Sequence, residues 1–438
     1  MGNGEDMVMN DLFPEQLADA LPALDRASGL SRLEAFVGKA GGAYAKGRNY
    51  DLGPGHHHLV SCLSGHLRRR LMTEAEVIEA VLSRHSFAAA EKFITEVYWR
   101  TYFKGWLEMR PSVWQQWLSD LARLPRSADL EKACSGQTGI DCFDAWADEL
   151  ISTGYLHNHA RMWFASIWIF TLRLPWQQGA EFFMAHLRDG DPASNTLGWR
   201  WVAGLQTRGK AYAARADNID QFTNGRFAPH GQLNEQIYAL DGPENPPAQP
   251  LAFPALNPVL CEGRPYLLLL TAEDSHPESL PLADAPVCVA SLPALFGNHQ
   301  LGPDKGWLRT SMVDQMDEFA LNDTLARAKG CFAASECEAV HLGEDVLEMR
   351  ALDMRDLIDQ TAERVAGLCE RFQVFDLVTS YLPAGFWCNH YQQLAAHPAL
   401  SSLRWHYVMR AYDRQAWPSA TKGFFPFKAK IPGWLGRH

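Results

Sequence analysis

Residues 154–201 read GYLHNHARMWFASIWIFTLRLPWQQGAEFFMAHLRDGDPASNTLGWRW, and this stretch decides the fold class. Apolar residues recur in it at helical spacing, with little strand character. The same stretch carries charged groups, an amide and an indole, namely Arg161, Asp189, Asp191, Asn195 and Trp199. Two carboxylates one residue apart need a partner if they are buried, and Arg161 is available upstream. Read by itself, the segment 189–191 favours a surface turn that caps the next helix.

The surrounding sequence extends this helical character over residues 12–230. Apolar residues at helical spacing predict helices over the segments 91–109, 140–152, 158–173 and 176–188. Pro111 marks an end for the first of these helices. Prolines then become frequent between residues 228 and 258. Their density predicts an extended linker, which we place at residues 231–260.

Residues 261–438 show a different pattern, in which short apolar runs alternate with helical stretches. The predicted strands are 266–274, 286–291, 338–345 and 375–383, and the predicted helices are 312–330 and 354–372. Strands that alternate with helices predict a parallel α/β sheet. Neither GxGxxG nor GxxxxGK[ST] occurs, so no nucleotide phosphate loop is indicated here. The expected fold class is therefore mostly α, with an all-helical domain followed by an α/β domain.

Charge limits the nucleic-acid partners that we expect. The chain has 438 residues and a net charge of −11, which opposes indiscriminate binding to phosphate backbones. A local basic face is still available from the triplet Arg68–Arg70 or from residues after the opening stretch. These later residues are Arg200, Arg208, Lys210, Arg215 and Arg226. A solvated surface is the simpler explanation of either cluster.

Other features favour a cytoplasmic monomer without a membrane partner. The first residues, MGNGEDMVMNDLFPEQ, are acidic and lack the apolar segment of a secretory signal. The longest apolar run, at 162–172, is shorter than the roughly 20 residues that span a bilayer. Nine cysteines occur without a CxxC pair, which favours reduced thiols. We expect no metal site.

The opening stretch resembles the helical FAD-binding domain of photolyases and cryptochromes. In that family the pattern D-G-D-x-A-x-N-x-x-x-W lines the flavin, and it matches residues 189–199. The resemblance implies that Asp189 pairs with Arg161 beside the flavin and that Asp191 lies near the isoalloxazine. It implies that Asn195 faces flavin N5, which is the choice of photolyases rather than of many cryptochromes. An amide can bond to a neutral or an anionic reduced flavin.

A second match lies upstream, where Glu96, Trp99 and Arg100 fit the photolyase pattern E-x-x-W-R. The resemblance implies that Glu96 bonds to damaged pyrimidines and that Trp99 stacks on them. Trp201 matches the opposing aromatic wall. Met162 matches a methionine of the same pocket, and Arg215 is expected on the DNA side. Stacking between aromatic walls suits a flipped base pair, and ordinary helix packing is the alternative.

Electron transfer and phosphate binding both depart from the family pattern. Trp199 and Trp176 match the inner two members of the tryptophan chain that photoreduces the flavin, but the third position holds Ala133. Either another indole replaces this third member, or the electron-transfer chain ends early. The candidate replacements are Trp146, Trp163 and Trp168.

The FAD phosphate loop of photolyases, T-S-R-L-S, corresponds here to His56, His57, His58, Leu59 and Val60. Backbone N–H groups can still hold a pyrophosphate. The implied cofactor set adds Tyr44, His57, Leu59, Ser61, Arg100 and Asn158 to the residues already named. The histidine triplet alternatively suggests a metal, which we do not expect without other ligands. His159 replaces an arginine that helps to hold DNA in photolyases.

The domain order is reversed relative to photolyases, which place an α/β antenna domain first. Residues 417–435 and 321–330 resemble segments of that antenna domain, which favours a circular permutation over an unrelated fused domain. A bound antenna chromophore is unknown.

The resemblance implies a deoxyribodipyrimidine photo-lyase, in which reduced FAD donates an electron to a pyrimidine dimer in damaged DNA. The alternatives are a cryptochrome-like blue-light sensor or flavin-binding protein without repair activity, and a scaffold without flavin.

Overall fold

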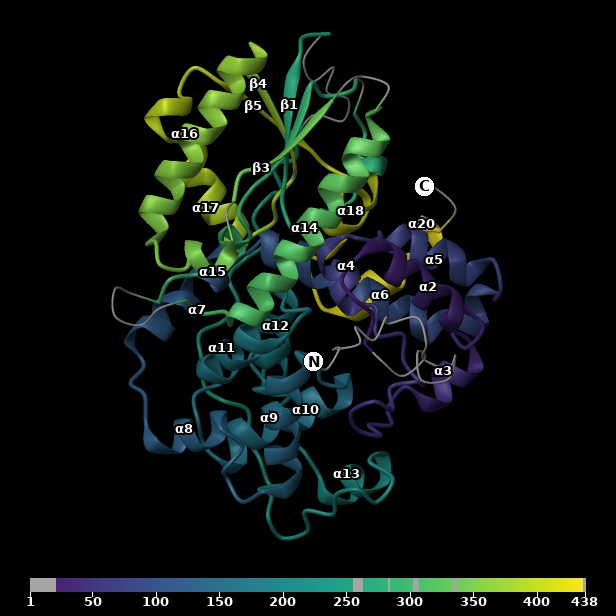
Figure 1. The fold of residues 1–438 in the computed structure, drawn as a ribbon. Coiled ribbons are helices and arrows are strands. Elements are labelled where there is room, and N and C mark those ends of the chain that lie inside the picture. Colours follow the sequence, from purple (N-terminus) through teal and green to yellow (C-terminus); the bar gives the residue numbers. More distant parts are fainter. Residues whose placement is uncertain are drawn as a thin grey trace, which may run out of the picture.

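Helices make up the first half of the chain in the computed structural model, which describes residues 21–254, 263–282, 284–301, 307–333, 337–343 and 345–435. These helices are α2 (Arg26–Val37), α3 (Gly42–Gly47), α4 (Ser64–Arg69), α5 (Glu74–Leu82), α6 (Phe87–Glu108), α7 (Pro111–Arg123), α8 (Ala128–Cys134), α9 (Asp141–Thr153), α10 (Asn158–Ser166), α11 (Trp176–His186), α12 (Pro192–Val202) and α13 (Ala216–Phe222). They form the lower part of the molecule in Figure 1. The predicted helical character of this half is confirmed.

Local signals start the helices that carry the site. Thr73 and Glu76 form a capping box at α5, in which each side chain accepts from the other residue's backbone N–H. Ser86 caps α6 and Asp191 caps α12, each through a side-chain oxygen that accepts from the backbone N–H three residues further on. The predicted helix 158–173 is instead α10 followed by a π-helical turn, Ile167–Thr171. Such turns insert one extra residue and rotate the side chains beyond them.

The second half contains a parallel sheet, as predicted, but with five strands instead of the four that the sequence predicts. Its strands are β1 (Tyr266–Leu270), β2 (Cys288–Ser291), β3 (Glu338–His341), β4 (Asp376–Ser380) and β5 (Arg404–Val408), in the order β3-β2-β1-β4-β5. The order reverses between β1 and β4, which places the switch point of the sheet at the carboxyl end of β1.

Helices cover both faces of the sheet (Figure 1). Leu267 and Leu269 of β1 share a core with α16 (Met354–Phe372) and α17 (Phe386–Ala395), whereas Leu268 shares a core with α14 (Ser311–Cys331). The short helix α15 (Val346–Met349) and 3-10 turns complete the connections. The helix predicted at 354–372 matches α16, and the one at 312–330 matches α14 within a residue.

The last helices return to the helical half of the molecule. They are α18 (Ala411–Ala416), α19 (Phe424–Lys428) and α20 (Ile431–Trp434), with a 3-10 turn at Trp417–Ser419. Figure 1 shows α18 and α20 beside α6. Phe424, Phe427 and Trp434 are buried in the same core as α6. The end of the range 261–438 therefore packs in the core of the helical half, whereas its strands pack in the cores on the two faces of the sheet.

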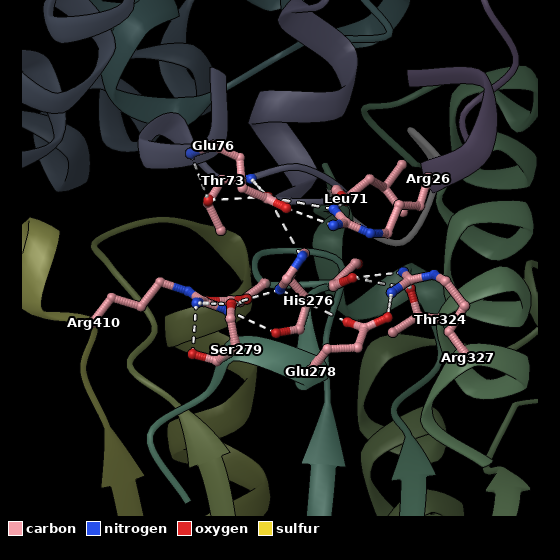
Figure 2. A network of polar contacts seen from close by, with 12 residues as sticks. Arg26, Leu71, Thr73, Glu76, His276, Glu278, Ser279, Thr324, Arg327 and Arg410 are labelled. Atoms are coloured by element: carbon pink, nitrogen blue, oxygen red, sulfur yellow. Dashed lines mark hydrogen bonds and ion pairs between the residues drawn. The ribbon is translucent and has the colours of Figure 1, made fainter. Parts of the chain in front are cut away.

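The two halves meet through buried ion pairs. Arg68 contacts Glu273, Arg69 contacts Asp317, and the three arginines Arg68–Arg70 are all buried. The prediction that this triplet contributes a basic surface is wrong, because its charges are neutralised inside the interface. A neighbouring network, shown in Figure 2, joins Glu76 of α5 to His276 of the loop after β1, with Nε2 3.4 Å from Oε2.

Among the described residues, no helix combines the length and the apolar character needed to cross a membrane.

Candidate functional site

Arg161 of α10 and Asp189, three residues after α11, form the ion pair that the sequence implies. Arg161 Nη2 lies 2.9 Å from Asp189 Oδ2, and Arg161 Nε donates to the Leu156 carbonyl at 2.8 Å. Burial opposes ionisation of Asp189, but the nearby guanidinium holds the pKa of this carboxyl below its ordinary value. The side chain is buried, so the alternative of a surface turn at 189–191 is wrong.

Asp191 is a buried N-cap with one carboxylate oxygen left over. Its Oδ1 accepts from the Ser194 backbone N–H at 2.8 Å. Its Oδ2 has no hydrogen-bond partner and lies 3.5 Å from Lys104 Nζ and 3.6 Å from Arg100 Nη2. Burial again opposes ionisation, and these cations hold the pKa of Asp191 well below its usual range. A buried anion with a free acceptor therefore stands at the start of α12.

Asn195 lies one turn further along α12 and has a fixed orientation. Its Nδ2 donates to the Ala180 carbonyl at 2.8 Å. A carbonyl can only accept, so the atom that contacts it must be the amide nitrogen. Within the described part of the chain, no hydrogen bond involves Asn195 Oδ1. This oxygen is free to accept from a ligand.

Glu96, Trp99 and Arg100 follow one another on α6, and protein groups contact all three. Glu96 pairs with Arg48. Trp99 stacks on Phe424 of α19, with ring centroids 3.5 Å apart and planes 11° from parallel. Arg100 donates to Glu74 Oε1 at 2.8 Å. One face of the predicted substrate wall is thus covered by the C-terminal segment.

The other predicted substrate residues are more open. Trp201 is half-buried and packs on Tyr212, with centroids 5.6 Å apart. Met162 is half-buried, and Arg215 is exposed and pairs with Asp217 at 3.3 Å. In the part of the chain that the structure describes, no hydrogen bond, ion pair or ring contact joins these residues to Trp99.

His57 lies in the core rather than on an open loop. Its Nε2 is 3.3 Å from Glu149 Oε1, and its ring stacks with His157 at a centroid distance of 6.4 Å. Its Nδ1 is buried without a hydrogen-bond partner, as is His157 Nε2. Burial lowers the pKa of His157 to about 4, so this imidazole is neutral near pH 7. Across the described residues, no group of three or more His, Cys, Asp and Glu side chains is arranged to hold a metal ion.

The remaining predicted cofactor residues differ in burial. Tyr44 is buried against Phe36 and Phe93. Leu59 and Ser61 are half-buried, and Arg32 Nε donates to the Ser61 carbonyl at 2.9 Å. Asn158, at the start of α10, and His56 are exposed.

Trp199 meets a different indole from the one predicted. Its ring lies 6.0 Å from Trp168 at an angle of 81°, and Trp168 belongs to the π-helical turn. Trp176 instead faces the Arg200 guanidinium at 6.0 Å. Gly179 allows the Trp199 ring to approach α11, because a Cβ at this position would overlap the ring. Of the candidate substitutes, Trp168 is therefore the one beside Trp199, whereas Trp146 and Trp163 stack on each other at 5.5 Å.

Sequence reasoning missed Lys104, Glu74 and Glu273. Lys104 follows Arg100 by four residues on α6, a spacing that places both cations on one helix face. Glu273 follows a buried strand at the carboxyl end of a parallel sheet, where functional side chains commonly lie. Both signals were available, but the sequence did not show that the two residues meet.

Comparison with known proteins finds a family match that includes the site. Residues 93–233 match the family described as FAD binding domain of DNA photolyase. A deoxyribodipyrimidine photo-lyase from Streptomyces griseus is 32% identical over 248 residues, which cover 51% of this chain and 54% of that protein. The corresponding protein of Escherichia coli K12 is 28% identical over 46% of this chain and 44% of its own. The chain thus spans about half the length of the curated relatives it matches.

Among solved structures, a bacterial class III photolyase from Agrobacterium tumefaciens aligns with a TM-score of 0.40 and 28% identity. The alignment covers 46% of this chain and 43% of that one. The sequence match includes the segments that carry Arg161, Asp189, Asp191 and Asn195. Over residues 93–233, this chain is therefore similar to the FAD-binding domain of DNA photolyase.

Proposed function

We propose that this protein is an FAD-dependent photolyase that uses light to split pyrimidine dimers in damaged DNA. The observation that carries the proposal is the arrangement at the start of α12. There the Arg161–Asp189 pair, the buried Asp191 and the oriented amide of Asn195 follow one another along a segment that matches the FAD-binding family.

The polar atoms of this segment fit a flavin. Asp191 Oδ2 is a buried acceptor without a hydrogen bond, and Asn195 donates from Nδ2 to the Ala180 carbonyl of α11, which leaves Oδ1 as an acceptor. Asn195 Oδ1 would accept a hydrogen bond from a protonated flavin nitrogen, and Asp191 would accept one from the isoalloxazine edge. The Arg161–Asp189 pair would hold the adjacent backbone in place. His57 Nδ1 and His157 Nε2 are buried without hydrogen-bond partners, and these imidazole groups would be available to hold the FAD phosphates. Bound FAD in its reduced state would supply the electron that opens the dimer.

The substrate side depends on α6 and on Trp201. Glu96 would bond to a pyrimidine once its pairing with Arg48 is released. Trp99 and Trp201 would stack on the bases, and Met162 and Arg215 would lie beside them. Phe424 covers one face of Trp99, so a base must use the surface that this ring leaves free.

A second candidate is a cryptochrome-like photosensor that binds FAD without repairing DNA. Two observations favour it. Trp99 is already stacked on Phe424, and Glu96 is already paired with Arg48. Both proposed substrate contacts are thus engaged within the protein.

Repair of a dimer-containing oligonucleotide under blue light separates these candidates. Purified protein loaded with FAD and reductant should restore the undamaged bases. Glu96→Gln should bind FAD as the natural protein does but repair slowly, since it loses an anionic acceptor. Flavin uptake with no light-dependent repair would support the photosensor.

We further propose that the chain acts as a monomer in the cytoplasm and that its domain order is a circular permutation of the family's. The eight described cysteines are free thiols, which suits a reducing compartment. Size-exclusion chromatography and cell fractionation would test the first two points.

A further inference from the structure

Lys104 connects the flavin-side carboxylate to the other half of the molecule. Its Nζ lies 3.5 Å from Asp191 Oδ2 and 3.0 Å from Glu273 Oε2. The residue is 5% exposed, so water screens neither contact appreciably. One ammonium group therefore stands between a carboxylate of the helical half and a carboxylate of the α/β half.

Glu273 reaches this position because the loop after β1 enters the helical half. Arg68 Nη2 lies 2.8 Å from Glu273 Oε1, and Arg68 Nη1 donates to the Ala272 carbonyl at 3.3 Å. Arg68 Nε donates to the Gly190 carbonyl at 2.8 Å. The same guanidinium thus fixes both the loop of the sheet and the backbone between Asp189 and Asp191.

The charges of this cluster balance. Three carboxylates, on Glu74, Asp191 and Glu273, face three cations, on Arg68, Arg100 and Lys104. Glu74 also contacts Arg70, whose charge is balanced by Asp413. All six side chains are largely buried. Loss of one member would leave a buried charge without compensation. The net charge beside Asp191 therefore depends on a residue from the α/β half.

We propose that Lys104 and Glu273 are positioning residues that set the charge at Asp191, so that the loop after β1 completes the flavin site. This inference rests on the proposed FAD binding. Reduction adds negative charge to a flavin, so the positive charge of Lys104 favours the reduced cofactor, and the negative charge of Glu273 moderates that effect. The α/β half thereby influences the redox state of a cofactor that it does not itself bind.

Redox titration of the FAD-loaded full chain against reference dyes tests the proposal. Lys104→Met should shift the equilibrium between reduced and oxidised flavin about tenfold toward the oxidised form, because it removes a buried positive charge that water screens poorly. Glu273→Gln should shift it in the opposite direction. The double variant should return close to the natural value, and Lys104→Arg should stay there.

Glu76→Gln is the matched control. It removes a charge from another contact between the two halves, the Glu76–His276 pair of Figure 2, and glutamine preserves the capping box. Its flavin equilibrium should not change.

Opposite shifts of the two single variants are the signature of charge, because simple loosening of the site would move both in one direction. Shifts of the same sign, or no shift in Glu273→Gln, would overturn the inference. Glu273→Gln preserves the shape of the side chain and leaves Lys104 charged. Its flavin equilibrium therefore tests the inference even if Lys104→Met does not fold. Failure of the natural protein to take up FAD would instead refute the proposed function.

Discussion

Asp191→Asn removes one charge from the buried cluster and little else. Asparagine caps a helix about as well as aspartate, so α12 should keep its start. At 3.5 Å and an effective dielectric constant near 20, the attraction between Asp191 and Lys104 is about 5 kcal/mol before desolvation is counted. Lys104 retains Glu273, and Arg100 retains Glu74. We therefore expect a net loss of about 2–3 kcal/mol, below the usual cost of breaking a buried pair.

Urea unfolding at pH 7 measures this loss. The control is Asp217→Asn, which breaks the exposed pair with Arg215 and should change the free energy of unfolding by less than about 0.5 kcal/mol. The pKa of Asp191 is lowered in the folded protein, so its contribution is present above the unfolded pKa of about 3.9. It disappears as the pH falls through the folded value. Equal free energies for both variants at pH 7 would refute the reasoning.

Three further predictions concern other parts of the molecule. Gly179→Ala should lower the free energy of unfolding by about 1–3 kcal/mol, because its Cβ would overlap Trp199. Gly198→Ala, where a Cβ meets nothing within 4 Å, should be neutral or stabilising, and equal melting temperatures for the two variants would contradict the packing. Phe424→Leu should increase the affinity for dimer-containing DNA, because it uncovers one face of Trp99. The control Phe425→Leu, at a ring that is 83% exposed, should not change this affinity. Equal affinities of the two variants in fluorescence anisotropy with labelled DNA would show that the stack does not matter. His157 has a folded pKa of about 4 against 6.5 when unfolded, so its burial should destabilise the protein by up to about 3 kcal/mol as the pH falls from 6.5 to 4. His157→Gln should make the free energy of unfolding depend less on pH between 6.5 and 4. An unchanged slope in this pH range would contradict the assigned role of His157.

The regular elements were largely predictable because their periodicity is local. The helix at 354–372 begins after Asp353, whose side chain caps it, and its apolar positions face the sheet. Strand β5 (RWHYV) was missed because its polar residues interrupt the continuous apolar run by which β1 is recognised.

Contacts between distant segments were not predictable from local patterns. The triplet Arg68–Arg70 looks like a basic surface in the sequence, because nothing nearby in the chain shows that Glu273 and Asp317 neutralise it. Trp99 was assigned to substrate, whereas Phe424 from the far end of the chain stacks on it. The Arg161–Asp189 pair was predictable because both residues lie within one segment that resembles a known motif.

Titration of the purified protein with FAD tests the central claim most directly. The natural protein should bind FAD stoichiometrically and show flavin absorbance, whereas Arg161→Met should bind it at least about tenfold more weakly, since Asp189 would be left as a buried unpaired charge. Arg126→Met, which removes an exposed ion pair with Glu131, is the control and should bind FAD normally. Equal FAD binding by all three proteins, or no binding by the natural one, would contradict the assignment of this segment to the flavin.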